Sequence, residues 1–335
     1  MTASEWRTTR LWEETTAAAG TVAATIRTTD AAAVAAMLGS PDTRRVVATG
    51  NGAAYYAALA LWLAALEGGS GPEVVTVPAG LVARGAFRWR DGDVLLAFSS
   101  SGEMRDVIEA LDAGAPQPYA AITAAPESTI GSRADALALV TVASQEAVTH
   151  TQAFCGNVAA ALLVWAELTG DGTLRDAITS LPEAIAAAAA DAESWVGGLE
   201  LATPPAAVVF GSGPAWAAAL EGALLLKEVA LVPSEGVETR EGATSAMYAL
   251  APGQLVVSIP TGDDLLLEEA EHVCATRGAT IVRAPGADRA DRRLAAVTAF
   301  PSLVALAAAL GVARGLDVDR PAWLADYYAV ARGTT

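Results

Sequence analysis

The feature that most constrains the fold of this chain is an internal repeat. VVATGNG at 46–52 aligns with AVVFGSG at 207–213, which sets Gly50 against Gly211 at an offset of 161 residues. The same offset aligns DVLLAFSSSGEMRDVIEAL at 93–111 with QLVVSIPTGDDLLLEEAEH at 254–272. Two separate matches at one offset predict two halves that share one order of strands, turns and helices.

Short apolar runs bounded by Gly, Pro or Asp alternate with Ala- and Leu-rich segments at helical spacing. The runs RVVATG, DVLLAFS, AAVVFG, QLVVSIP and ATIVRAP are typical of buried parallel strands. This alternation predicts an α/β protein in which each half is a parallel sheet flanked by helices, with ligands at the carboxyl ends of the strands. We expect an N-terminal helical segment over 1–30, a first domain with a linker helix over 31–195, and a second domain with a C-terminal tail over 196–335.

The composition argues against several classes of function. A formal net charge of −17 disfavours nucleic acid as a partner, because binding to the phosphate backbone needs clustered Lys and Arg. No apolar run reaches the roughly 18 to 20 residues of a membrane helix, and the N-terminus lacks the apolar stretch of a secretion signal. The two cysteines, Cys155 and Cys274, lie far apart and have no metal-type spacing. We therefore expect a cytoplasmic protein with reduced thiols and without a membrane partner.

Two polar turns in the first half follow apolar strands and precede helices. The candidate ligand-binding residues there are Gly50, Asn51 and Gly52 in the first turn and Ser99, Ser100, Ser101, Gly102 and Glu103 in the second. Glycines let backbone amides approach a ligand at a helix N-terminus, although such a turn also serves as a tight strand-to-helix junction. Serine is also a good helix cap, but capping needs one serine rather than three. The second turn therefore favours binding of an anion or a polyhydroxylated ligand.

Charge distinguishes the helices that follow the two glycine turns. The stretch GSGPAWAAALEGALLLKE at 211–228 carries Glu221, Lys227 and Glu228, whereas GNGAAYYAALALWLAAL at 50–66 carries no charge. Glu221 and Glu228 are seven residues apart and so share one helix face. A carboxylate on an apolar helix is costly to bury unless it is paired or used. Alternatively, Lys227 and Glu228 have no role in a site and are either solvated or joined in an ion pair.

Taken together, these motifs resemble the sugar isomerase (SIS) domain used twice in one chain. The likeness covers SSSGEM at 99–104, HTQAF at 150–154, ALEGALLLKE at 219–228 and DVDRPAWLAD at 317–326. The chain is similar to the isomerase half of glucosamine-6-phosphate synthase and to the fructosamine-6-phosphate deglycases. The resemblance implies two flavodoxin-like three-layer domains, a sugar ligand, and a homodimer with a shared active site. It also implies that Glu228 moves a proton between C1 and C2 of an open-chain sugar.

Several positions depart from the pattern of that family. Ala53, Ala54 and Met104 stand where the family carries hydroxyls around the phosphate of its ligand. Thr244 stands where the family has its ring-opening histidine, while Leu225 and Asp326 replace lysines. Each missing hydroxyl is typically worth about 1 kcal/mol or somewhat more to a charged acceptor. We therefore expect an unphosphorylated or unusual ligand.

The candidate site is completed by residues near those altered positions. They are His150 and Thr151 beside the sugar site, with His150 a possible second catalytic residue, and Glu221, Glu235, Arg240, Glu241 and Thr244 as further ligand-binding residues. A lone histidine is often structural, and SEGVETREG at 234–242 is otherwise a charged loop. His272 is expected on an exposed helix face. Neither a metal nor a nucleotide cofactor is expected, because two distant histidines form no ligand cluster and no full G-x-G-x-x-G occurs.

The leading hypothesis is an enzyme that moves a proton next to the carbonyl or imine of an unphosphorylated or unusual sugar, amino sugar or sugar-like metabolite. The outcome would be isomerisation, deamination, elimination or deglycation. One alternative is a sugar-binding regulator without catalysis. The other is the ordinary hexose-6-phosphate isomerase or deglycase activity of the family.

Overall fold

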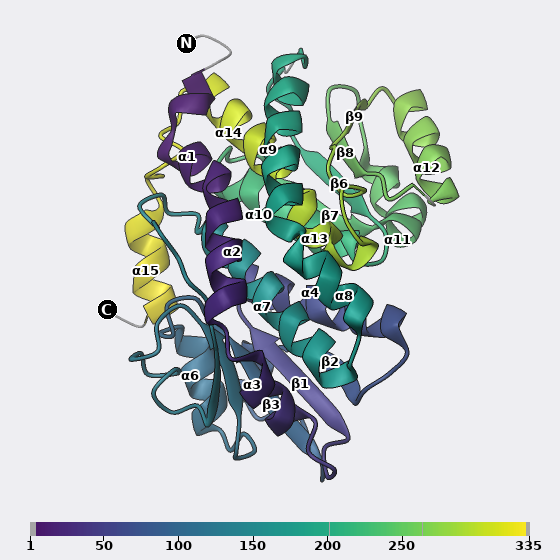
Figure 1. Cartoon of the computed structure of the whole chain (residues 1–335). Coiled ribbons are helices and arrows are strands. Elements are labelled where there is room, and N and C mark those ends of the chain that lie inside the picture. Colours follow the sequence, from purple (N-terminus) through teal and green to yellow (C-terminus); the bar gives the residue numbers. More distant parts are fainter. Residues whose placement is uncertain (1–4, 201, 263, 333–335) are drawn as a thin grey trace. The chain divides into compact units, whose positions relative to one another are not determined.

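The computed structural model of the chain describes residues 5–200, 202–262 and 264–332 (Figure 1). The chain divides into two compact units, each with one parallel sheet. The first-sheet unit comprises Gly20–Ala143, Gln152–Ser180 and Trp323–Thr335. The second-sheet unit comprises Met1–Ala19, Ser144–Thr151 and Leu181–Ala322. The predicted parallel α/β architecture in two halves is confirmed.

The sheet of the first-sheet unit has the strand order β2-β1-β3-β4-β5, and its paired strands are all parallel. Its strands are β1 (Arg45–Gly50), β2 (Glu73–Pro78), β3 (Asp93–Phe98), β4 (Ala120–Thr123) and β5 (Ala136–Leu139). Its helices are α2 (Ala18–Thr28, which begins in the other unit), α3 (Ala31–Leu38), α4 (Ala53–Gly68), α5 (Ala79–Ala83), α6 (Arg105–Asp112), α7 (Thr151–Thr169), α8 (Gly172–Thr179) and α15 (Leu324–Arg332). The order reverses at β1, so the turns after β1 and β3 meet at the edge where ligands bind in such sheets.

Alternation along the strands builds the core of this unit. Leu95 and Ala97 of β3 face a cluster with Val107 and Leu111 of α6, and all four side chains are buried. Residues between them on β3, such as Leu96, are also buried, because the sheet carries helices on both faces. Helix α4 packs on β1 and β2, and α3 packs on β4 and β5.

The sheet of the second-sheet unit has the parallel order β7-β6-β8-β9. Its strands are β6 (Ala207–Gly211), β7 (Ser234–Glu238), β8 (Leu255–Ile259) and β9 (Thr280–Arg283). Its helices are η1 (Glu5–Thr8), α1 (Arg10–Thr16), α9 (Leu181–Gly197), α10 (Ala215–Glu228), α11 (Thr239–Thr244), η2 (Ala246–Ala249), α12 (Leu265–Thr276), η3 (Arg292–Leu294), α13 (Ala295–Thr298) and α14 (Phe300–Ala313). Helix α10 packs on β6 and β7, and α14 packs against α9 and α10, as Figure 1 shows.

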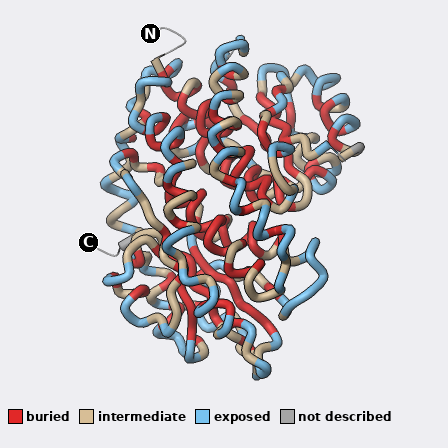
Figure 2. The backbone as a smooth tube through the Cα atoms, viewed as in Figure 1, coloured by how far each residue is buried: buried red, intermediate tan, exposed pale blue. Residues whose placement is uncertain are grey.

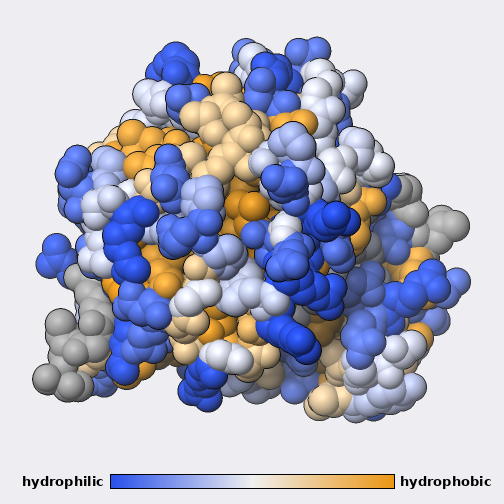
Figure 3. Space-filling model, turned by 90° about the horizontal axis from the view of Figure 1, so that it is seen from below, coloured by the Kyte–Doolittle hydropathy of each residue, from blue (hydrophilic) through white to orange (hydrophobic). Residues whose placement is uncertain are grey.

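Two long apolar helices form much of the buried interior, which is drawn red in Figure 2. Thr151–Thr169 and the helical stretch Arg292–Ala313 are long and apolar enough to cross a membrane, although the sequence had predicted no run of that length. Their alanines, glycines and threonines break up the apolar runs while the average hydropathy stays high. Within each window 83% and 94% of the residues are buried, so both are core helices of a folded protein. On the face drawn in Figure 3, hydrophilic side chains lie between smaller apolar patches.

The boundaries of the compact units differ from those of the domains expected from the sequence. Helix α9, assigned to the first domain over 31–195, falls in the second-sheet unit because it packs along α14. The N-terminal residues to Ala19 also join that unit. The boundaries at 30 and 195 stay predictions from the repeat. Two smaller expectations are confirmed: His272 is exposed on α12, and both cysteines are free thiols, which are buried.

Candidate functional site

The serine turn of the first-sheet unit is a compact loop between β3 and α6. Gly102 adopts a left-handed backbone with φ +65°, and a Cβ added there would lie 1.7 Å from the Oγ of Ser128. Only glycine fits at this position without displacing Ser128. The C=O of Gly102 also accepts the N–H of Ile130 at 3.1 Å. The loop is therefore built against the neighbouring turn that carries Ser128 and Ile130.

None of the three serines caps helix α6, because its N-cap residue is Met104, which makes no side-chain cap bond. The Oγ of Ser99 accepts the N–H of Gly102 at 3.1 Å, and the Oγ of Ser101 accepts the N–H of Glu103 at 3.3 Å. The Oγ of Ser100 accepts the Nδ2 amide of Asn157 in α7 at 3.0 Å. All three serine oxygens therefore accept bonds. Ser99 is fully buried, so the prediction that it binds a ligand is wrong: its side chain shapes the turn. Ser100 and Ser101 are half-buried, and their hydroxyl protons can point to a ligand oxygen.

Two predicted ligand-binding side chains of this unit are already bonded. Both Glu103 carboxylate oxygens accept from Thr129, one from its N–H at 2.7 Å and one from its hydroxyl at 2.8 Å. The Nδ2 amide of Asn51 donates to the Oδ2 of Asp106 at 2.8 Å. Glu103 thus ties the serine turn to the 128–131 turn, and Asn51 ties the glycine turn to α6.

The glycine turn lines a cavity of about 530 Å³ in the first-sheet unit. Its walls include Gly50, Asn51 and Gly52 from the turn, Tyr55 from α4 and Arg105 from α6. Gly50 has no room for a side chain, because a Cβ would lie 2.9 Å from the backbone of Ala54 and Tyr55. The predicted turn therefore borders open space at the carboxyl end of β1, where ligands bind in parallel sheets.

The positions of the family's phosphate-binding hydroxyls carry no hydroxyl in this chain. Ala53 and Ala54 form the first turn of α4, whose N-cap Gly52 supplies no side-chain bond. Met104 is partly buried against the core cluster of this unit. The amide groups of these turns remain, but the side-chain donors that would grip a phosphate are absent from these three positions.

The equivalent turns of the second-sheet unit are occupied by a carboxylate of that unit. The Oγ of Ser212, which aligns with Asn51, is bonded to the Oδ2 of Asp264, which aligns with Glu103. Asp264 also caps α12, since its carboxylate accepts the N–H of Leu267 at 3.3 Å. The second copy of the turn is thus closed by a carboxylate, which disfavours an anionic ligand there.

Helix α10 carries two carboxyls of unusual character in the second-sheet unit. Glu221 is only 2% exposed, and its Oε2 makes no hydrogen bond within the described part of the chain. Burial, followed by the charge of Glu228, raises the pKa of Glu221 well above its ordinary range. Burial of this kind favours the neutral form of the carboxyl, which can donate a hydrogen bond.

Glu228 is the last residue of α10 and has the pKa of a general acid or base. Burial raises its pKa to about 7, against smaller lowering effects of the Thr149 hydrogen bond and the Lys227 charge. The hydroxyl of Thr149 lies 3.5 Å from the Oε2 of Glu228. A group with a pKa near the working pH can both take up and release a proton during a reaction.

Thr149, His150 and Thr151 belong to the same unit as Glu228, within the segment Ser144–Thr151. The hydroxyl of Thr151 is buried and has no partner among the described residues. His150 is half-buried and immediately follows the residue that contacts Glu228. The structure therefore brings the predicted segment and the predicted carboxylate together in one unit.

The remaining candidates lie on the surface of β7 and α11. Glu235, Arg240, Glu241 and Thr244 are all exposed. The Thr244 hydroxyl donates to the backbone of its own helix, at 3.1 Å to the C=O of Glu241 and 3.2 Å to that of Arg240. Their role across a dimer contact stays a prediction.

Sequence reasoning missed three residues that build the site. Thr149 contacts Glu228, Asn157 contacts Ser100, and Glu14 holds the segment that carries Thr149. A polar residue inside an apolar helix, such as Asn157 in FCGNVAAALL, is a usable signal, because burying it requires a partner. Nothing in the sequence links Glu14 to residues 130 positions later.

Comparison with known proteins gives related sequences and matching structures. The chain is 30% identical over 279 residues to the glutamine–fructose-6-phosphate aminotransferase (isomerizing) of Leifsonia xyli, an alignment that covers 71% of this chain and 45% of that protein. It is 25% identical over 318 residues to the enzyme of the same name from Legionella pneumophila, covering 85% of this chain and 51% of that protein. The chain thus spans about half the length of the curated relatives it matches. No protein-family model matches it.

Solved structures show the same fold over nearly the whole chain. The C-terminal domain of glucosamine-fructose-6-phosphate aminotransferase from Francisella tularensis superposes with a TM-score of 0.78 at 18% identity, covering 93% of this chain and 98% of that one. Glucosamine-6-phosphate deaminase from Thermotoga maritima superposes with a TM-score of 0.76 at 20% identity, covering 93% and 97%. The chain therefore has the tandem sugar isomerase fold, and the resemblance to sugar isomerase domains is confirmed.

Proposed function

We propose that this chain is an enzyme that moves a proton next to the carbonyl or imine carbon of a sugar or amino sugar, with Glu228 as the general acid and base. In this scheme the ionised Glu228 takes a proton from the carbon beside the carbonyl or imine. The electron pair left behind forms the carbon–carbon double bond of an enediol or enamine, as the carbonyl oxygen or imine nitrogen takes up a proton from the second proton-transfer residue, for which His150 is proposed below. That residue recovers a proton when the product carbonyl forms. The protonated carboxyl then returns the proton to the neighbouring carbon, or the intermediate expels a leaving group.

The observation that carries this proposal is the buried Glu228 carboxyl with a pKa of about 7. An ordinary surface glutamate would be too weak a base, since its pKa lies well below neutral pH. The position of Glu228 at the carboxyl end of α10 adds to the effect, because the helix dipole disfavours negative charge there. Thr149 orients the carboxylate, and His150 is proposed as the second proton-transfer residue.

We propose an unphosphorylated sugar or amino sugar as the substrate. The relatives named above are described by fructose-6-phosphate or glucosamine-6-phosphate, but Ala53, Ala54 and Met104 supply no hydroxyl for a phosphate here. The hydroxyl protons of the half-buried Ser100 and Ser101 suit a neutral polyol instead. The charge of −17 works in the same direction. A homodimer with a shared site, involving Glu235, Arg240, Glu241 and Thr244, belongs to the same proposal.

A ligand comparison tests the choice of substrate. Thermal stability is measured with each hexose or hexosamine beside its 6-phosphate, because a ligand stabilises the folded state in proportion to the logarithm of its concentration over Kd. We expect the unphosphorylated member of a pair to raise Tm and the phosphate to have less effect. Stabilisation by phosphates alone would contradict this choice and support the ordinary phosphosugar activity.

A pair of matched variants tests the chemistry. Glu228→Gln keeps the shape of the side chain but removes the base, and we expect turnover to fall by about 10² to 10⁴ while ligand binding persists. Glu67 occupies the aligned position in the first repeat and is exposed, so Glu67→Gln is the control. Ligand binding without turnover in the unaltered protein would favour a sugar-binding regulator.

A further inference from the structure

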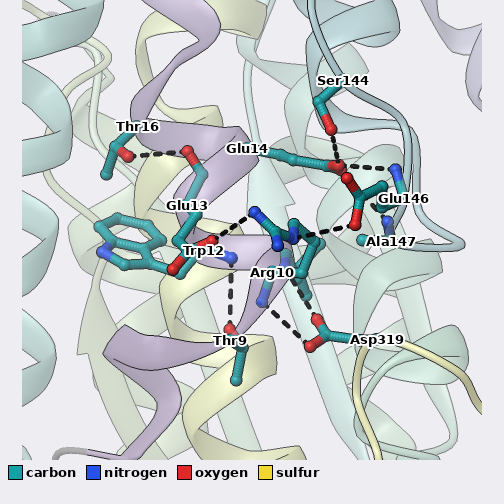
Figure 4. A network of polar contacts seen from close by, with 11 residues as sticks. Thr9, Arg10, Trp12, Glu13, Glu14, Thr16, Ser144, Glu146, Ala147 and Asp319 are labelled. Atoms are coloured by element: carbon teal, nitrogen blue, oxygen red, sulfur yellow. Dashed lines mark hydrogen bonds and ion pairs between the residues drawn. The ribbon is translucent and has the colours of Figure 1, made fainter.

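The segment that carries Thr149 and His150 has no regular structure of its own. Residues 144–150 form neither helix nor strand, and α7 begins directly after them. A loop places a functional group accurately only where surrounding residues hold its backbone. The contacts that hold this loop include the carboxylate of Glu14, the backbone C=O of Asp319 and an ion pair between Arg10 and Glu146 at 3.3 Å, all within the second-sheet unit (Figure 4).

Glu14 of α1 is 2% exposed and accepts three bonds from the loop. Its Oε1 accepts the Ser144 hydroxyl at 2.6 Å and the N–H of Glu146 at 2.6 Å. Its Oε2 accepts the N–H of Ala147 at 3.4 Å. Figure 4 shows these groups converging on the Glu14 carboxylate from the loop side. Hydrogen bonds to a buried carboxylate are among the stronger ones in proteins.

Asp319 fixes the helix that carries Glu14. Its carboxylate accepts the backbone N–H groups of Arg10 at 3.0 Å and Leu11 at 2.8 Å, at the first turn of α1. The backbone C=O of Asp319 accepts the N–H of Val148 at 3.1 Å. Helix α1 and the loop are therefore held by one residue just before the loop reaches Thr149.

We propose that Glu14 is a positioning residue for Glu228, because it holds the backbone at 144–147 and thereby sets the Thr149 hydroxyl against the Glu228 carboxylate. This inference rests on the proposed role of Glu228 as the acid and base. The bonds of Glu14 described above go to Ser144, Glu146 and Ala147, so its effect on Glu228 passes through the loop.

The charge environment of Glu228 indicates what loosening the loop would do. From α10, the charge of Lys227 lowers the pKa of Glu228. The charge of Glu228 in turn raises the pKa of Glu221 on the same helix. From the loop, the Thr149 hydrogen bond lowers that pKa, and His150 is the one ionisable residue among 147–151. Loss of the Thr149 bond leaves burial less opposed, so the pKa of Glu228 rises.

The test is a titration of Glu228 by carbon NMR of the full chain labelled at glutamate carboxyls, with the Glu228 signal assigned from Glu228→Gln. We expect Glu14→Gln and Thr149→Val each to raise the pKa of Glu228 by on the order of half a unit. The double variant should shift it no further than Thr149→Val alone, because both act through one bond. Glu193→Gln is the control, since Glu193 bonds the ring N–H of Trp12 on α1 at 2.9 Å but does not touch the loop.

A merely structural role for Glu14 would lower Tm without moving this pKa, and that result overturns the inference. An equal shift in Glu193→Gln overturns it as well, because it would trace the effect to α1 in general. Should Glu14→Gln fail to fold, Ser144→Ala removes one of the same bonds and is read in the same way. The titration needs no substrate, so it decides the positioning role even if no sugar is turned over and the proposed function fails.

Discussion

The two repeats begin with the same backbone and end with opposite chemistry. Gly52 and Gly213 align and have similar positive φ angles, 55° and 53°, which favour glycine. In the first repeat the carboxylate of Glu103 bonds Thr129 of the neighbouring turn and not the glycine turn, which lines a cavity. In the second repeat the aligned Asp264 bonds back to Ser212 and closes the turn. The aligned carboxylates of the two repeats therefore bond to different partners: only that of the second repeat bonds the glycine turn of its own unit.

The helices that follow these two turns differ in the carboxyl groups that they carry and in how far these are buried. Positions 60 and 67 of α4 align with Glu221 and Glu228 of α10, and they hold the buried Ala60 and the exposed Glu67. Both helices end their alignment on a glutamate, but the one in α4 is exposed while the one in α10 is half-buried, with burial raising its pKa. The comparison teaches that the two repeats differ by burial as much as by residue type: the turns of the first carry hydroxyls and amides, and α10 of the second carries carboxyls of raised pKa.

The largest expected effect distinguishes the open turn from the closed one. Gly102→Ala places a Cβ 1.7 Å from the Oγ and 2.4 Å from the Cβ of Ser128 at a left-handed φ, so we expect a loss of about 3 kcal/mol or more. Gly262 of the second turn also has a positive φ but no atom within 4 Å of an added Cβ. Gly262→Ala should cost only about 1 to 2 kcal/mol. Urea unfolding of both variants measures the difference, and equal losses would show that the serine turn is not tightly built.

The second prediction concerns the aligned glutamates. The pKa of Glu228 is about 7 in the folded state against an ordinary value of 4.5, so the unfolded state loses this proton first as the pH rises. Glu228 therefore costs stability progressively between pH 4.5 and 7 and in full above pH 7. Glu228→Gln should be more stable than the unaltered protein by up to about 3 kcal/mol at pH 8 and about equal at pH 4.

Its control is the exposed position of the first repeat. Glu67→Gln should change the free energy of unfolding by less than about 0.5 kcal/mol at either pH. Urea unfolding at pH 4, 6 and 8 gives both curves. A pH-independent difference for Glu228→Gln would contradict the buried, high-pKa description of this carboxyl.

The repeat, and the turns and helices aligned by it, made most of the fold predictable from the sequence. Strand runs such as DVLLAFS are short and bounded by turn residues, so β3 and β8 fall where the pattern placed them. Glu228 could be singled out because a carboxylate on an apolar helix needs an explanation. The sequence analysis found no apolar run as long as α7. Small and polar residues interrupt the run, although the helix is apolar on average and mostly buried.

The orientation of side chains at the turns could not be predicted. Glu103 and Asp264 are chemically alike and aligned, yet their carboxylates bond to different partners. The sequence encodes which groups are available, but whether a carboxylate turns inward depends on which donors the surrounding turns present. The same reason hides Glu14, whose partners lie 130 or more residues away.

A smaller effect is expected from opening the closed turn. Asp264→Ala removes the N-cap of α12 and the bond to Ser212, and we expect a loss of about 1 to 2 kcal/mol. Glu103→Ala removes the bonds to Thr129 but no helix cap, so it should cost about 1 kcal/mol. Thermal unfolding compares the two. A larger loss for Glu103→Ala would mean that the first turn, rather than the second, depends on its carboxylate for its shape.

The smallest expected effect lies where the two aligned helices end. Helix α4 is followed by its C-cap residue Gly69 at φ 64°. The turn after α10 instead contains Leu231 at φ 52°, a backbone conformation that suits glycine. The N–H of Val232 bonds the C=O of Leu226 at 2.9 Å, so Leu231 holds a helix-ending turn three residues after Glu228.

Leu231 is 44% exposed, so Leu231→Gly loses little burial while it relieves the backbone. We expect it to stabilise the protein by about 1 kcal/mol in urea unfolding, and Gly69→Leu to destabilise it by a similar amount. Because natural strain persists near functional groups, a stabilised Leu231→Gly variant with reduced turnover would assign the strain to the placement of Glu228. A stabilised variant with full turnover would instead make Leu231 a tolerated departure from the glycine used in the first repeat.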